Sequence, residues 1–205
     1  MRVGTKMQKE RIESLTDLVF GLALSLTALA LIIRTQETLP DLLRNLAVFA
    51  FSFIIVISVW LSYSNVLEHI RVESALALWL NVALLLLVAF EPYLLDVMAF
   101  DEQGLVNGDL ANGASALYAL DLGLIWLIMG ALYHLALREE GDPQLVRWRN
   151  SRIIDAGVFL VSAAPVFWTI ELLDTPIRFW MWVSLLPIGA VRDRWVDRRW
   201  GTKNE

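Results

Sequence analysis

Six stretches of this 205-residue chain carry no charged residue, and with their flanks each is long enough to be a helix that crosses a membrane. They are residues 18–33, 45–67, 74–90, 122–137, 156–170 and 179–191. Charged residues make up 19% of the chain but cluster between these stretches, and 57% of all residues are hydrophobic. A soluble helical bundle distributes its charges more evenly, so the pattern predicts an integral membrane protein.

Several of these stretches are shorter than the ~20 residues that span a bilayer, so we expect the helices to extend into their flanks. The expected helices cover residues 13–34, 45–67, 73–96, 114–138, 153–172 and 176–196. Together they predict an all-α fold with six transmembrane helices in a single domain over residues 1–205. Pro165 and Pro187 are expected to kink the fifth and sixth helices, as prolines often do inside membranes.

The distribution of basic residues predicts the orientation of these helices. With six spans, the side that holds both termini and the second and fourth loops carries all but three of the 17 lysines and arginines; the exceptions are Arg34, Arg44 and Arg178. Because cytoplasmic loops are enriched in Lys and Arg, both termini are expected in the cytoplasm. A signal peptide cleaved after residues 28–30 is an alternative for the first helix, but acidic residues interrupt its positively charged start.

Residues near the expected helix ends suit the membrane surface. Most of the nine tryptophans lie toward these ends, among them Trp60, Trp126 and Trp182, which predicts an aromatic belt at the interface. The third loop, residues 99–113, is acidic and rich in Gly and Asn, which is typical of an exposed connection.

The sequence offers little for catalysis or metal binding. It has no cysteine, which excludes disulfides and thiolate ligands. His69 and His134 lie at ends of the second and fourth helices without a neighbouring ligand set; each is either a pH-sensitive group or a residue at the headgroup level. Asp121 and Glu171 lie near span ends and are expected to be solvated boundary residues. We therefore expect no enzyme activity, no cofactor, no bound metal and no nucleic-acid partner.

The first expected helix carries a stripe of large apolar side chains. By three- and four-residue spacing, one face holds Leu15, Leu18, Leu22, Ser25, Leu26, Leu29 and Ile33. Two arrangements fit this stripe: packing against other helices, with Gly21 and Ser25 as a pair of small residues, or the lining of a narrow pore. Packing is the commoner arrangement, and periodicity alone does not decide between them.

The start of this helix has a recognisable signature. Residues 11–17, RIESLTD, resemble the Arg-x-x-x-Phe-Ser-Asp signature of prokaryotic potassium channels related to the lysosomal potassium channel transmembrane protein 175. Arg11 and Asp17 match it, whereas Leu15 and Thr16 replace Phe and Ser. The resemblance implies that these four residues anchor the first helix and do not touch the ion. The alternative is ordinary helix-start chemistry, since hydroxyl and acidic residues favour an N-terminus.

Further positions agree or disagree with this family. Ser25 stands eight positions after the aspartate, where the family has a hydroxyl residue, and Asn81 matches a Leu-Asn pair of the family's third helix. The family often has a histidine pair after a tryptophan that corresponds to Trp60, where this chain has Tyr63 and Ser64. The family's six-helix repeat would cover essentially the whole chain.

The resemblance implies a potassium-permeable cation channel in the cell membrane of a prokaryote. Four copies of the chain would form a homotetramer in the lipid bilayer, with the first helix of each around the pore. The resemblance further implies that Leu22, Leu26 and Leu29 form hydrophobic rings that constrict the pore, and that Ser25 adds a hydroxyl layer beside the first ring. Potassium is then a permeant ion rather than a cofactor.

Two other functions fit the same sequence. A non-conducting membrane scaffold or assembly subunit would use the leucine stripe for packing. A secondary transporter would need paired broken helices and a charged residue near the middle of the membrane, and the sequence shows neither clearly.

Overall fold

The chain is almost entirely helical in a computed structural model that describes residues 2–33, 38–70, 74–99, 108–172 and 175–185. The helices are α1 (Arg2–Ile33), α2 (Leu39–His69), α3 (Ala75–Ala99), α4 (Gly108–Glu140), α5 (Pro143–Ser162) and α6 (Val166–Thr169). Strands β1 (Glu171–Leu172) and β2 (Thr175–Pro176) then pair antiparallel, and residues 177–185 are helical.

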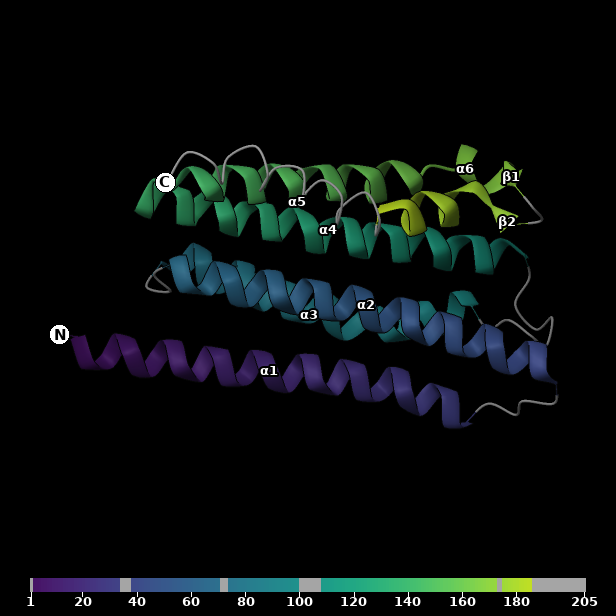
Figure 1. Cartoon of the computed structure of the whole chain (residues 1–205), viewed down its shortest axis with the longest axis horizontal. Helices are drawn as coiled ribbons and strands as arrows, with labels where there is room; N and C mark the ends of the chain where they lie inside the picture. Colours follow the sequence, from purple (N-terminus) through teal and green to yellow (C-terminus); the bar gives the residue numbers. More distant parts are fainter. Residues whose placement is uncertain (1, 34–37, 71–73, 100–107, 173–174, 186–205) are drawn as a thin grey trace, which may run out of the picture.

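The five long helices lie side by side along the long axis of the molecule (Figure 1). Helix α1 forms one edge, α2 and α3 lie in the middle, and α4 and α5 form the opposite edge. Within this bundle α1 packs against α2 and α3, α3 against α4, and α4 against α5. Among the described residues, other helices therefore cover one side of α1 only.

Local sequence sets where these helices begin. Thr38 caps α2: its Oγ1 accepts a hydrogen bond from the Asp41 N–H (3.3 Å), and the Asp41 carboxylate accepts one from the Thr38 N–H (3.1 Å). Asp142 caps α5 through the Gln144 N–H (2.8 Å). Between α4 and α5, Gly141 has a φ of 71°, a conformation that glycine adopts without a steric cost.

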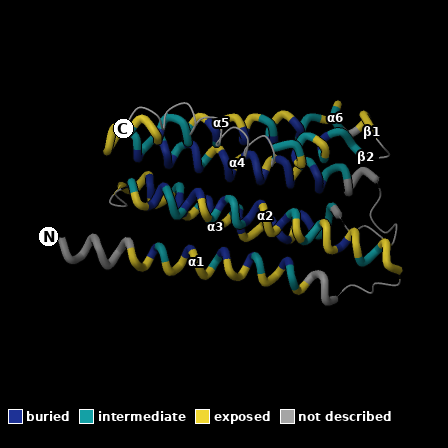
Figure 2. Tube along the Cα trace, viewed as in Figure 1, coloured by how far each residue is buried: buried dark blue, intermediate teal, exposed yellow. Residues whose placement is uncertain are grey.

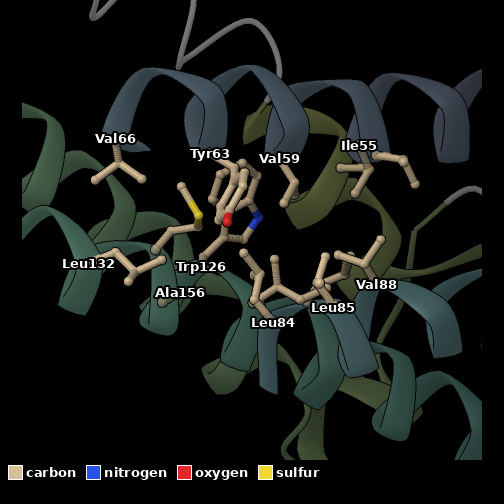
Figure 3. Packing of buried hydrophobic residues seen from close by; sticks show 14 of the residues in the cluster. Ile55, Val59, Tyr63, Val66, Leu84, Leu85, Val88, Trp126, Leu132 and Ala156 are labelled. Carbon is tan, nitrogen blue, oxygen red and sulfur yellow. The ribbon is translucent and has the colours of Figure 1, made fainter. Parts of the chain in front are cut away.

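The apolar core lies between the middle helices and α4 (Figure 3). Side chains of α2, α3, α4 and α5 meet there, among them Ile55, Val59, Tyr63, Val66, Leu84, Leu85, Val88, Trp126, Leu132 and Ala156. Two tryptophans expected in an interfacial belt are part of this core instead. Trp126 is buried, and so is Trp182, whose Nε1 donates to Ser162 Oγ (2.7 Å). A donor partner inside the subunit lets a tryptophan leave the interface.

Four helices are long and apolar enough to cross a membrane among the described residues, namely α1 to α4. The expectation of an all-helical, multi-pass membrane protein is thus confirmed. The first four expected helices match α1 to α4, and the observed helices are longer. They continue past charged residues because charge marks where a helix leaves the hydrocarbon, not where its hydrogen bonding ends.

The boundaries expected for the fifth helix were wrong. The fifth was placed at 153–172, but α5 runs from Pro143 to Ser162 and carries its arginines on its first turns. A turn at 163–165, which includes Pro165, then separates α5 from α6, so the proline lies at a break between two helices rather than at a kink within one. The sixth was placed at 176–196; it is helical over 177–185, and its remainder with Pro187 lies outside the described residues.

Packing between α4 and α5 leads to a prediction at Gly123. A Cβ built there would lie 2.7 Å from the Leu160 side chain and 3.2 Å from its backbone nitrogen. Gly123→Ala should therefore separate α4 from α5 and lower the free energy of unfolding by about 1–3 kcal/mol. The measurement is the apparent Tm of the purified protein in detergent.

Gly157→Ala is the matched control, because a Cβ at this helical glycine meets no atom within 4 Å. Its Tm should stay the same or rise, since alanine favours helices over glycine. Equal losses in both variants would show that α4 and α5 do not approach as closely as described.

Candidate pore helix and its anchor

Helix α1 has two distinct faces. Buried side chains recur along one face, at Ile12, Thr16, Phe20, Ala23 and Thr27. Exposed leucines run along the other, at Leu15, Leu18, Leu22, Leu26 and Leu29. Figure 2 shows this alternation of buried and exposed positions along the tube of α1. The buried face packs on the bundle, and the leucine face points away from it.

The residues that the family resemblance assigns to the pore lining all lie on the exposed face. Leu22, Leu26 and Leu29 have exposed fractions of 57%, 45% and 47%, and Ser25 is exposed beside them. Gly21 is exposed too, and a Cβ built there meets no atom within 4 Å. The pair of small residues therefore makes no close helix contact within the described part of the subunit. The face is open to lipid, another subunit or a water-filled pore.

The hydroxyl of Ser25 is held by its own helix. Its Oγ donates a hydrogen bond to the Gly21 carbonyl (2.7 Å), a common arrangement for serine inside helices. With the proton used in this way, the lone pairs of the oxygen remain able to accept a hydrogen bond or face a cation. Thr27 on the buried face likewise donates to the Ala23 carbonyl (3.0 Å).

The signature segment makes hydrogen bonds to α2, and one of them continues to α3. Thr16 is buried, and its Oγ1 donates to Tyr63 Oη of α2 (3.4 Å). Tyr63 in turn donates to Asn81 Oδ1 of α3 (2.5 Å). Phe20, one turn further along α1, packs on the Tyr63 ring with centroids 6.4 Å apart. A single buried polar chain thus joins three helices.

Asp17 makes a second contact with α2. Its Oδ1 accepts a hydrogen bond from Trp60 Nε1 (2.9 Å), although the aspartate itself is exposed. Indole nitrogen only donates, so a carboxylate is a suitable partner. The other two signature residues lie elsewhere: Arg11 is exposed, and Leu15 is on the leucine face with 51% exposed.

Sequence reasoning did not identify Trp60 and Tyr63 as the partners of the signature. Trp60 was assigned to the membrane interface, and Tyr63 was noted only as a departure from the family's histidines. Their spacing is the signal that was available, because residues three apart on α2 share a helix face. Two polar groups on one face of an apolar helix favour contacts with another helix over contacts with lipid.

The two histidines contact aromatic and basic groups of the bundle. His69 Nδ1 lies 2.8 Å from the Asn65 carbonyl, and the ring meets Trp148 edge-on. His134 Nδ1 lies 3.3 Å from Arg149 Nη1. Within the part of the chain that the structure describes, no three potential metal ligands gather.

Comparisons with known proteins agree with this architecture. Residues 11–92 match the family model described as endosomal/lysosomal potassium channel TMEM175. The fold is similar to the crystal structure of a lysosomal potassium-selective channel TMEM175 homolog from Chamaesiphon minutus, with a TM-score of 0.68 at 19% identity over 91% of this chain and 96% of that one. No curated protein matches the sequence. The resemblance to the TMEM175 family is therefore confirmed in sequence over residues 11–92, from the signature into α3, and most of the chain shares the fold of the solved homolog.

Proposed function

We propose that this protein is a potassium-permeable cation channel that assembles as a homotetramer, with α1 of each subunit lining a central pore. The observation that carries the proposal is the position of Leu22, Ser25, Leu26 and Leu29 on the face of α1 that the described part of the subunit leaves uncovered. The matching family and the similar solved structure are both described as potassium channels, which supports the same function.

Rings of leucine would control conduction by excluding water. A narrow apolar ring dewets, so a cation passes only when the ring widens or hydrates. Leu22, Leu26 and Leu29 recur at three- and four-residue spacing, which stacks three such rings along the pore. The Ser25 oxygen supplies a dipole beside the first ring. Because leucine offers no ligand to replace hydration water, selectivity for potassium over sodium is modest in this mechanism.

The signature residues would fix where α1 stands. Thr16 and Asp17 connect α1 to Tyr63 and Trp60 of α2, and Tyr63 connects it onward to α3. In hydrocarbon, interhelical hydrogen bonds of this kind resist separation of the helices. The contacts lie on the opposite side of α1 from the leucines, so they hold the helix without entering the pore.

The proposed channel lies in the cell membrane of a prokaryote, with both termini in the cytoplasm. The excess of lysine and arginine on the side of the termini supports this orientation. The protein needs no cofactor for passive conduction, and potassium is the permeant ion.

Leu26→Ala tests the leucine rings. The smaller side chain should widen the middle ring, raise cation flux several-fold and reduce discrimination between potassium and sodium. The measurement is flux into liposomes, with potassium, sodium and an impermeant organic cation compared. Leu86→Ala is the matched control, because Leu86 is an exposed leucine of α3 (55%) and should leave flux unchanged.

The scaffold alternative gives a different result in the same assay. A scaffold would show no potassium flux in folded wild-type protein at any voltage or pH, and Leu26→Ala would reduce assembly instead. Equal effects of the Leu26 and Leu86 substitutions on flux would exclude α1 as the specific lining.

Cross-linking tests the assembly, and the chain suits it because the sequence contains no cysteine. Leu26→Cys should form disulfide-linked dimers on mild oxidation, since copies of α1 around a narrow pore bring equivalent side chains together. Leu86→Cys should not form them. The readout is non-reducing electrophoresis of protein in native membranes, and a product that stays monomeric at position 26 would contradict the shared pore.

Tyr63→Phe tests the anchor. The change leaves Thr16 Oγ1 and Asn81 Oδ1 without their shared partner in a buried site, which should cost about 1–3 kcal/mol. The apparent Tm should fall and the open probability of single channels should change. Tyr93→Phe is the control, because Tyr93 is 67% exposed and its hydroxyl can be lost without effect. Identical behaviour of the two variants would remove Tyr63 from the anchor.

A further inference from the structure

A second polar cluster lies inside the bundle, on helices other than the pore helix. Its centre is Glu91 of α3, which is 1% exposed although it belongs to an apolar helix. Ser52 Oγ of α2 donates to both Glu91 carboxylate oxygens (2.9 and 3.0 Å), and Tyr118 Oη of α4 donates to Oε1 (3.0 Å). The carboxyl group thus connects three membrane-spanning helices.

A second carboxyl group accompanies Glu91. Asp121 follows Tyr118 by one turn of α4 and is 4% exposed, so the expectation of a solvated boundary residue was wrong. The helix extends well beyond it on both sides, which places it within the bundle rather than at its end. Its Oδ2 is buried and has no hydrogen-bond partner among the described residues. Tyr118, which donates to Glu91, lies on the same helix as Asp121, so the two buried carboxyl groups belong to one region of the bundle.

The charged groups of the surrounding helices do not neutralise this pair. Residues 18–33 of α1 and 45–67 of α2 contain no charged side chain, and Tyr63, which is in the second range, is used in the anchor. The buried guanidinium of Arg178 donates a hydrogen bond from Nη2 to Asn112 Oδ1 (3.0 Å). Within the described ranges neither Glu91 nor Asp121 forms an ion pair. Asp155 of α5 forms one with Arg152 of the same helix.

We propose that Glu91 and Asp121 form a proton-binding site, in which their two carboxyl groups hold at least one proton between them in the folded protein. Two unpaired negative charges buried in one region of low dielectric constant are costly, and a bound proton removes one of them. A proton on Asp121 also removes the cost of burying a charged Oδ2 that accepts no hydrogen bond among the described residues. The site stands apart from the leucine face and does not depend on the proposed conduction.

The site has a consequence for stability. In the unfolded chain both carboxyl groups meet water and release the proton at neutral pH, whereas the folded chain retains it. The folded state then binds more protons than the unfolded state, so stability falls as pH rises. Conversion of both groups to amides removes this contribution to the pH dependence.

Infrared spectroscopy of the protein in bilayers tests the proposal. A protonated carboxylic acid has a C=O stretch separate from those of carboxylate and amide groups, and the band shifts in D₂O. We expect such a band in the wild type at mildly acidic to neutral pH, and its loss in the Glu91→Gln, Asp121→Asn double variant. Glu68→Gln, at an exposed glutamate of the same bundle, should keep the band.

Each outcome of this experiment decides the proposal. No carboxylic acid band in folded wild-type protein overturns it, and so does a band that the double variant retains. If the double variant does not fold, the wild-type band is titrated with pH in D₂O, and the Tm of the wild type is measured over the same pH range. A band that is lost together with stability at alkaline pH supports the site. A stability that is independent of pH overturns it. Because the readout is spectroscopic, it is unaffected by whether the protein conducts ions.

Discussion

The lack of hydrogen-bond partners in hydrocarbon governs this structure. A backbone group that crosses a bilayer must be satisfied within its own segment, which leaves helices as the available structure for these long apolar stretches. Polar side chains inside the bundle face the same condition and meet it between helices. One such chain, Thr16–Tyr63–Asn81, joins α1, α2 and α3, and another, Ser52–Glu91–Tyr118, joins α2, α3 and α4.

These two hydrogen-bonded chains hold different helices of the bundle together. The second lies among the more deeply buried helices, where it fixes α4 against the middle of the molecule, and α4 in turn packs along α5. The first attaches α1, which has neighbours on one side only. This helix, with little support from the described part of its own subunit, also carries a row of exposed leucines along its free face. An apolar face of this size needs lipid or other protein around it, and in the proposed channel copies of the same helix would take that place.

The sequence was a good guide to the apolar stretches and a poor guide to polar contacts between them. Charge-free runs predicted α1 to α4 because membrane solvation acts on each helix separately. The end of α5 was missed because Pro165 was expected to kink a continuous helix. The burial of Asp121 was missed because it depends on neighbouring helices. In the sequence, Asp121 stands at the end of an uncharged stretch and is expected to be solvated. The packing of α3 against α4 buries it.

In the candidate site, too, the features of a single helix could be predicted from the sequence, whereas contacts between helices could not. The stripe of leucines was visible from its periodicity, since a helix face follows from local geometry alone. Its exposure was not visible, because one face of an apolar helix looks the same whether it packs or lines a pore. Likewise Thr16 and Asp17 could be singled out by resemblance, but Trp60 and Tyr63 as their partners follow from how α1 crosses α2, which no single-helix pattern contains.

The position of the anchor along α1 bears on how the proposed pore could open. Asp17 is the last residue of α1 with a described hydrogen bond to another helix, and the hydroxyls of Ser25 and Thr27 bond to their own helix. Leu29 lies twelve residues beyond Asp17, or about 18 Å along the axis at 1.5 Å per residue. Apolar contacts over this length are non-directional and allow small shifts. A tilt of a few degrees about the anchor would thus move Leu29 more than Leu22, and would widen the far ring first.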